Sequence, residues 1–197
     1  MPGIIISQKF VTLTIHLSKI DLKNYIKKLI VKHIRNKSFK MVLTTKGIKR
    51  VMKELEEAKK PSSDQFYQIF SDPSNIQMIY AITTKLDGIY QNGQFIILIK
   101  LPDEYPLAPP VVQFKTPNGK FECDSNICLN ITHFHSETWS PLLTIDKIVQ
   151  SVISVMYDKT MESGVGFIST SDEQKIKYSQ ESGEYNKKHN ANILSFM

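Results

Sequence analysis

The 197-residue chain is poor in cysteine and has no long apolar run. Its two cysteines, Cys123 and Cys128, lie five positions apart with no third or fourth partner, which argues against a disulfide framework and a multi-cysteine metal site. Apolar runs such as Ile4–Ile6 and Phe95–Ile99 fall far below the ~18 residues that a membrane-spanning helix needs. We expect no transmembrane segment and no bound metal. The two cysteines and the absence of a secretory signal fit a reducing compartment. A cysteine with no structural role there can have a role in a reaction.

Acidic residues are scarce at the start of the chain. The formal net charge is +6, but residues 1–40 hold eight lysines and Arg35 against Asp21 alone, whereas residues 41–197 hold 16 basic and 18 acidic side chains. Only the first segment therefore suggests a nucleic-acid binder. The remainder is nearly neutral and does not interleave aromatic and basic residues on a predicted sheet, so we expect no nucleic-acid partner.

The basic segment 1–40 is expected to be an N-terminal extension, and its role stays open between three interpretations. A transit peptide would also be poor in acids, but it would favour arginine and serine over the lysine and isoleucine found here. Alternatively, Met41 is the native start, because the strong sequence signals begin directly after it. The third interpretation is a basic arm that rests on an anionic membrane.

Hydrophobic periodicity predicts a helix followed by four strands. From Thr45 onward, apolar residues recur at helical spacing among lysine and glutamate, and Pro61 closes this amphipathic helix. Short β-branched or aromatic runs separated by turn residues then predict the strands Phe66–Phe70, Met78–Thr83, Gln94–Leu101 and Val111–Thr116. Their order predicts an antiparallel meander.

Two further helices are expected after the strands. Thr144 is the predicted N-cap of a largely buried helix with apolar positions from Ile145 to Met156. The run Thr170–Glu173 is a predicted capping box that opens a polar helix through about Lys188. Helix, four strands, helix and helix is an α+β order.

The stretch Leu101–Leu143 has no long periodic element, and ordered loops of this length are usually functional. It contains the side chains best suited to chemistry: Asn118, Cys128, His133, His135, Glu137 and Trp139. Each has an ordinary interpretation as well. A cysteine between isoleucine and leucine can be a small core residue, an asparagine after proline can be a turn residue, and histidines can be surface residues.

Five blocks of sequence within and beside this stretch carry a specific resemblance. They are Gly93-Gln94-Phe95, Leu101–Pro110, Thr116-Pro117-Asn118-Gly119, Ile127-Cys128-Leu129-Asn130 and Thr138–Ile145. In this order they resemble the ubiquitin-conjugating enzyme family, and Lys49–Leu55 resembles that family's first helix. The resemblance runs from residue 45 to about residue 188. It implies an α+β ubiquitin-conjugating fold: an N-terminal helix, a four-stranded antiparallel meander, an active-site loop and two or more helices.

The resemblance also implies a division of the chain. Residues 41–190 are expected to form the ubiquitin-conjugating catalytic domain, and residues 191–197 a short C-terminal tail.

The motif before Cys128 departs from the family's best-known His-Pro-Asn. This chain has Thr116-Pro117-Asn118, followed by Lys120 and Phe121. These features, with the Phe134–Trp139 insertion, resemble the endoplasmic-reticulum-associated subclass, which serves quality-control degradation.

Two departures from that subclass stand out. Ser136 takes the place of a proline, and no membrane anchor follows Asn190. Because the subclass usually ends in an anchor, either the chain is shortened or this member is soluble. The resemblance implies a cytoplasmic location, with the cytosolic face of the endoplasmic reticulum as an option.

The resemblance assigns the nucleophile to Cys128, which would carry ubiquitin as a thioester, and leaves Cys123 without a chemical role. Thiolates attack well near neutral pH, and thioesters stay reactive toward amines. Asn118 matches the residue that stabilises the oxyanion during transfer, with a role in shaping the loop as the alternative. A base is not evident. His133, His135 and Glu137 are candidates to help an amine or hydroxyl lose its proton, or they stabilise the loop.

The expected partners are ubiquitin, its activating enzyme, a ligase and protein substrates. By resemblance, the activating enzyme and ligase bind through Arg50 and Lys53, and the ligase also through Leu107, Pro141 and Leu142. A solvated helix face is the alternative for Arg50 and Lys53. No metal or organic cofactor is expected, because ATP is used by the upstream activating enzyme. The alternative functions are a catalytically inactive ubiquitin-binding variant and conjugation of a ubiquitin-like modifier.

Overall fold

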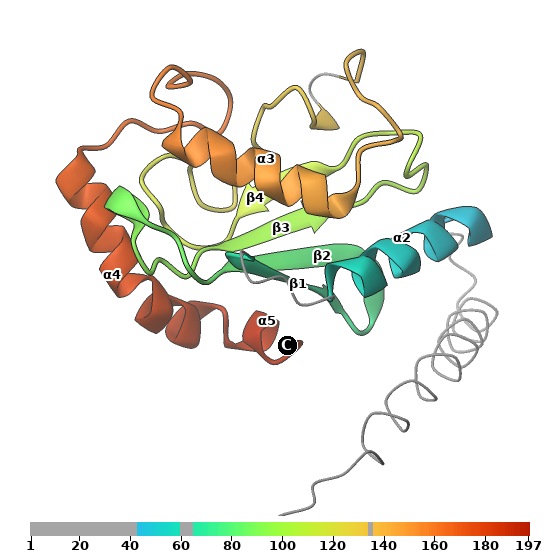
Figure 1. Ribbon diagram of the computed structural model, residues 1–197, viewed down its shortest axis with the longest axis horizontal. Helices are drawn as coiled ribbons and strands as arrows, with labels where there is room; N and C mark the ends of the chain where they lie inside the picture. Colours follow the sequence, from blue (N-terminus) through green and yellow to red (C-terminus); the bar gives the residue numbers. More distant parts are fainter. Residues whose placement is uncertain (1–42, 60–64, 134–135) are drawn as a thin grey trace, which may run out of the picture. The chain divides into compact units, whose positions relative to one another are not determined.

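A four-stranded antiparallel sheet lies at the centre of the fold (Figure 1). The computed structural model describes residues 43–59, 65–133 and 136–197, which belong to one compact unit. The strands are β1 (Tyr67–Asp72), β2 (Asn75–Thr83), β3 (Ile96–Lys100) and β4 (Val111–Phe114), paired in that order. This confirms the predicted meander, with strand ends within three residues of the prediction.

The helix directly before the sheet and the helix directly after it both begin at threonine caps. Helix α2 (Thr45–Ala58) is capped by Thr44, whose hydroxyl accepts from the Gly47 N–H. Helix α3 (Ile145–Tyr157) is capped by Thr144, as predicted, through the Lys147 N–H. Side-chain oxygens in these positions satisfy N–H groups that have no partner within the helix. Figure 1 shows α3 lying across one face of the sheet.

Helix α4 (Asp172–His189) begins one residue later than the predicted capping box implies. Its cap is Ser171, whose hydroxyl accepts from the Gln174 N–H. The Thr170 hydroxyl instead donates to the Gly119 carbonyl oxygen at 2.8 Å. Placing the box at Thr170 was therefore wrong, because the Thr170 hydroxyl binds the loop that contains Gly119 and leaves capping to Ser171.

Two short elements were not predicted. The 3₁₀ turn η1 (Gly88–Tyr90) follows β2, and helix α5 (Ala191–Leu194) lies near the end of the chain. Neither is long enough to produce a recognisable hydrophobic period. Ile193 packs with Tyr80, Ile82 and Leu98 on one face of the sheet, so residues expected as a tail contribute to a buried cluster. In the part of the chain that the structure describes, no helix combines the length and hydrophobicity needed to cross a bilayer.

Candidate active site

Cys128 lies in the long connection between β4 and α3, held by buried neighbours on each side. The Ile127 N–H donates to the Val112 carbonyl oxygen of β4, and the Leu129 N–H donates to the Thr132 hydroxyl, each at 3.0 Å. Both flanking side chains are buried, whereas Cys128 is only half-buried. The sequence Ile-Cys-Leu thus anchors the main chain in the core and leaves Cys128 itself only half-buried.

A second segment closes against the Cys128 main chain. The Cys128 N–H donates to the Val165 carbonyl oxygen at 3.0 Å. The next residue, Gly166, has φ +82°, and a Cβ atom there would lie 2.5 Å from the Asn126 carbonyl oxygen. Glycine is therefore required for the chain after α3 to approach this closely. The site is built from two segments that are far apart in the sequence.

Cys123 has the properties of an unreactive thiol. It is half-buried and forms an isolated parallel bridge with Phe114. Burial, with a smaller effect of the Asp124 carboxylate, raises the pKa of the Cys123 thiol to about 11. Because the thiolate is the nucleophilic form, this raised pKa disfavours reaction at Cys123 near neutral pH. The expectation that Cys123 has no chemical role stays a prediction.

Asn118 is fully buried and tied to the main chain of its own loop. Its side-chain oxygen accepts from the N–H groups of Lys120 and Phe121, at 2.9 and 2.8 Å. Its amide nitrogen donates to the Thr116 carbonyl oxygen at 3.2 Å. Gly119, which lies between Asn118 and Lys120, has φ +80°, a conformation that favours glycine. These hydrogen bonds show that Asn118 shapes its own loop. Its role as a donor to the oxyanion stays a prediction.

Lys120 was noted in the sequence only as part of the motif, yet it is 4% exposed. Its ammonium donates to the main-chain oxygen of Asp158 at 2.6 Å and lies 5.8 Å from the centre of the Phe167 ring. Burial lowers the pKa of Lys120. The Lys120 side chain therefore joins the loop of residues 116–121, called here the Asn118 loop, to the end of α3.

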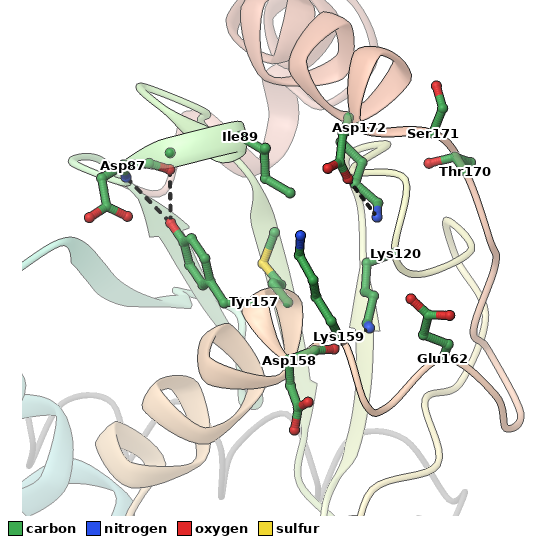
Figure 2. A pocket seen from close by; sticks show the side chains of 13 residues that line it. Asp87, Ile89, Lys120, Tyr157, Asp158, Lys159, Glu162, Thr170, Ser171 and Asp172 are labelled. Atoms are coloured by element: carbon green, nitrogen blue, oxygen red, sulfur yellow. Dashed lines mark hydrogen bonds and ion pairs between the residues drawn. The ribbon is translucent and has the colours of Figure 1, made fainter.

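Lys120 also lines a pocket of about 510 Å³ beside the loop (Figure 2). The walls come from η1, the end of α3 and the start of α4, with Asp87, Tyr157 and Asp172 among the lining residues. The Tyr157 hydroxyl donates to the Asp87 carbonyl oxygen at 3.3 Å and closes one side. Both acidic and basic side chains surround the pocket, so its charge alone selects no ligand.

The candidate acid–base residues lie in the loop that follows Cys128. His133 is exposed, its main-chain N–H donates to the Pro110 carbonyl oxygen at 3.1 Å, and partial burial lowers its pKa. Glu137 is exposed. His135 lies outside the described residues. No metal-holding group of three or more His, Cys, Asp or Glu side chains occurs in residues 43–59, 65–133 and 136–197.

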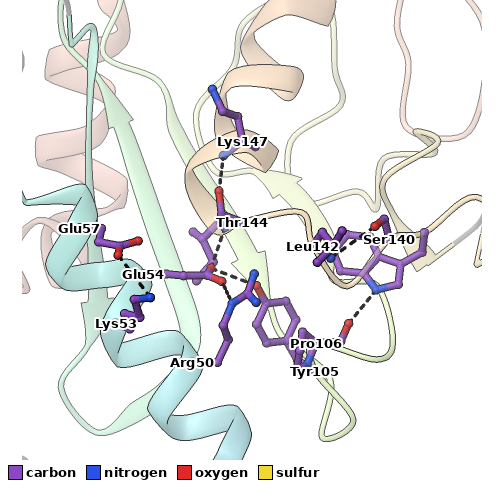
Figure 3. A network of polar contacts seen from close by, with 12 residues as sticks. Arg50, Lys53, Glu54, Glu57, Tyr105, Pro106, Ser140, Leu142, Thr144 and Lys147 are labelled. Carbon is purple, nitrogen blue, oxygen red and sulfur yellow. Dashed lines mark hydrogen bonds and ion pairs between the residues drawn. The ribbon is translucent and has the colours of Figure 1, made fainter.

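The residues expected to bind a ligase come from α2 and two loops (Figure 3). Lys53 is exposed and lies 3.8 Å from the Glu57 carboxylate, whereas Arg50 is partly buried against Glu54. Leu107 and Leu142 are 77% and 84% exposed. Large apolar side chains this exposed are typical of contact surfaces when they are grouped.

The two loops that carry these leucines are joined directly. Residues 101–110 form the Leu107 loop, and residues 138–144 form the Leu142 loop. The Trp139 indole N–H donates to the Pro106 carbonyl oxygen at 2.9 Å, and the Tyr105 and Trp139 rings lie 6.4 Å apart. Pro141, in the same loop as Leu142, is exposed. The expected ligase-binding residues of these loops are thus presented from a connected framework.

The chain is similar to several proteins that are all named ubiquitin-conjugating enzymes. Ubiquitin-conjugating enzyme E2 6 of Debaryomyces hansenii is 32% identical over 120 residues, which cover 61% of this chain and 49% of the relative. Human ubiquitin-conjugating enzyme E2 J2 is 36% identical over 121 residues, covering 59% and 44%. The E2 J2-like protein of Dictyostelium discoideum is 31% identical over 143 residues, covering 72% and 82%. The matched region is thus about half of the Debaryomyces and human relatives.

The fold has a counterpart among solved structures. A crystal structure of a candidate ubiquitin conjugating enzyme from Plasmodium yoelii matches with a TM-score of 0.52 and 20% sequence identity, covering 74% of this chain and 96% of that one. This likeness supports the fold alone. The family model described as ubiquitin-conjugating enzyme matches residues 50–192, which include both cysteines, the Asn118 loop and helices α3 and α4. The chain therefore belongs to the ubiquitin-conjugating enzyme family.

Proposed function

We propose that this chain accepts ubiquitin as a thioester on Cys128 and passes it, with a ligase, to a substrate lysine. Serine and threonine hydroxyls are the alternative acceptors. The observation that carries the proposal is the half-buried Cys128, anchored by buried neighbours within the matched region of the family. The chemistry needs an accessible thiol whose main chain does not move, because positioning contributes much of the rate.

The first step exchanges one thioester for another. The Cys128 thiolate attacks the carbonyl carbon at the ubiquitin C-terminus, which arrives as a thioester of the activating enzyme. A carbon–sulfur bond to Cys128 forms, and the activating-enzyme thiolate leaves. ATP is spent in the earlier activation, so this chain needs no metal or organic cofactor of its own.

The second step transfers ubiquitin to the acceptor. A neutral amine attacks the thioester carbonyl, negative charge develops on its oxygen, and the Cys128 thiolate leaves as an amide bond forms. Asn118 is the proposed donor to this oxygen, in addition to its place in the loop. The attacking amine loses a proton, and His133, His135 and Glu137 remain the candidates to assist.

Partners follow from family membership and the exposed surface. We assign the activating enzyme and a ligase to the surface that carries Arg50, Lys53, Leu107, Pro141 and Leu142. The resemblance to the endoplasmic-reticulum-associated subclass supports a role in quality-control degradation and a cytoplasmic location, with the cytosolic face of the endoplasmic reticulum as an option. The relatives named E2 6 and E2 J2 are consistent with this assignment.

A charging assay tests the proposal. Activating enzyme, ATP and ubiquitin are incubated with the wild-type chain, Cys128→Ala or Cys123→Ala, and the products are separated with and without thiol reductant. We expect a reductant-sensitive adduct in the wild type and Cys123→Ala, and none in Cys128→Ala. A wild-type chain without an adduct would overturn the proposal. Ubiquitin-like modifiers would then be offered in the same assay, and failure of all of them would favour an inactive ubiquitin-binding variant.

A further inference from the structure

Glu54 is a carboxylate buried where three parts of the fold meet. It lies on α2 and is 5% exposed, although charged side chains are almost never this buried unless they are paired. Its Oε1 accepts from the Arg50 guanidinium one helical turn earlier. Its Oε2 accepts from the Tyr105 hydroxyl at 3.1 Å and from the Ile145 N–H at 2.8 Å. Figure 3 shows the Arg50 and Tyr105 side chains pointing toward Glu54.

These donors belong to different segments. Arg50 is on α2, Tyr105 lies in the loop after β3, and Ile145 is the first residue of α3. A carboxylate at the start of a helix is favoured by the helix dipole and satisfies an N–H that has no partner within the helix. Burial and the Glu54 carboxylate raise the pKa of Tyr105, so its hydroxyl stays a donor at neutral pH.

The exposed leucines lie close in sequence to these donors. Leu107 is two residues after Tyr105, and Leu142 is three residues before Ile145. The direct bond from Trp139 to Pro106 joins the same two loops a second time. The Glu54 carboxylate therefore fixes the bases of both loops relative to the helix that carries Arg50 and Lys53.

We propose that Glu54 is a positioning residue, which holds α2, the Leu107 loop and the Leu142 loop in the arrangement that presents one docking surface. Glu54 does not itself contact the partner, because it is buried beneath this surface. The inference rests on the proposed function, since the surface is the one assigned above to the activating enzyme and a ligase. Docking of these partners at α2 then depends on the buried Glu54 carboxylate.

Glu54→Gln is the variant of choice. Glutamine has the same size and keeps one acceptor oxygen, but it replaces the other oxygen with an NH₂ group that can only donate. It cannot accept from Arg50, Tyr105 and Ile145 together. Glu181→Gln is the matched control, because it removes one carboxylate from an exposed ion pair with Lys177 on α4.

The first measurement is the kinetics of charging by ubiquitin-activating enzyme, with ATP and ubiquitin in excess and the concentration of this chain varied. We expect Glu54→Gln to raise the half-saturating concentration about three- to tenfold, the size of effect typical of a residue that acts through its neighbours. The maximal rate should stay at the wild-type value, and Glu181→Gln should match the wild type throughout. A Glu54→Gln variant with wild-type half-saturation, or with a reduced maximal rate alone, would overturn the proposal.

The second measurement needs no ubiquitin, so it separates this inference from the proposed function. Trp139 is the chain's single tryptophan and is half-buried between the two loops. If Glu54 positions these loops, Glu54→Gln should shift the Trp139 emission to longer wavelength and increase its quenching by acrylamide, with the far-ultraviolet circular dichroism unchanged. Unchanged emission and quenching would overturn the inference even if the wild-type chain is not charged.

A milder variant covers the case in which Glu54→Gln does not fold. Tyr105→Phe removes one donor and leaves the carboxylate bonded to Arg50 and Ile145. The Trp139 emission should then change in the same direction by a smaller amount. Wild-type emission in Tyr105→Phe would count against a positioning role, because Tyr105 is the link from Glu54 to the Leu107 loop.

Discussion

The side-chain oxygen of Asn118 accepts a 2.8 Å hydrogen bond from the main-chain N–H of Phe121. With the bonds to Lys120 and Thr116, this contact closes the loop ten residues before Cys128 in the sequence. Asn118 thus has a structural role whatever its part in transfer. The two roles are partly separable by experiment, because the bonds from the Lys120 and Phe121 N–H groups use the acceptor oxygen, whereas an oxyanion would need the amide nitrogen, which here donates to Thr116.

Asn118→Ala should lose both roles. Charging of Cys128 is expected to persist, while discharge to free lysine slows by about 10²–10³, the cost of removing one oxyanion donor in other enzymes. The free energy of unfolding should fall by about 1–3 kcal/mol, because buried main-chain N–H groups lose their acceptor. Gel-based charging and discharge, together with urea unfolding, measure these effects.

Asn118→Asp is the discriminating partner of that variant. Aspartate keeps an oxygen for the Lys120 and Phe121 N–H groups but has no N–H to give to the Thr116 carbonyl oxygen or to a developing oxyanion. If Asn118 is the oxyanion donor, discharge should be as slow as in Asn118→Ala while stability is greater. Recovery of discharge in Asn118→Asp would show that transfer needs only the shape of the loop.

Cys123 should make stability fall at alkaline pH. The folded chain raises its pKa from 9.0 to about 11, so between these values the folded state holds a proton that the unfolded state has lost. Stability from this group is therefore complete below about pH 9 and is lost as the pH rises through the folded value. Urea unfolding of the wild type and Cys123→Ala across this range should show the wild-type advantage shrinking. A constant difference would contradict the assigned burial effect.

The order of the strands and the cap at Thr144 were predictable because they depend on local signals: turn residues, alternating apolar runs and a hydroxyl before an apolar period. The role of Glu54 was not predictable, because a glutamate on an amphipathic helix is expected to lie on the solvent-exposed face. Its partners Tyr105 and Ile145 lie 51 and 91 positions away. Lys120 was similarly hidden, since its burial depends on the end of α3. Motif resemblance singled out Cys128 as the expected nucleophile, which stays a prediction, but only the fold brings Val165 to its main chain.

Leu142→Arg should affect docking without affecting stability. The side chain is 84% exposed, and substitutions at such positions usually change the free energy of unfolding by less than about 0.5 kcal/mol. Discharge of charged Cys128 to free lysine in the absence of a ligase should be unchanged. Stimulation of that discharge by a RING domain that is active on the wild type should be lost, because the arginine places a charge in an apolar contact.

Ile176→Arg provides the control for that experiment, because Ile176 is an exposed apolar residue on α4, away from the docking loops. It should leave both the basal and the RING-stimulated discharge at wild-type rates. Equal loss of stimulation in the two variants would point to a general effect of added positive charge and would exclude a specific role for Leu142.

Ile193 tests where the folded domain ends. It is 4% exposed and packs on the sheet with Tyr80 and Leu98, beyond the boundary predicted at residue 190. Ile193→Ala should lower the free energy of unfolding by about 2 kcal/mol or more, because truncating a buried isoleucine removes apolar contact and leaves a cavity. Asn192→Ala, an exposed neighbour, is the matched control and should unfold like the wild type. If both variants have wild-type urea midpoints, the end of α5 adds no stability, and the domain ends with α4.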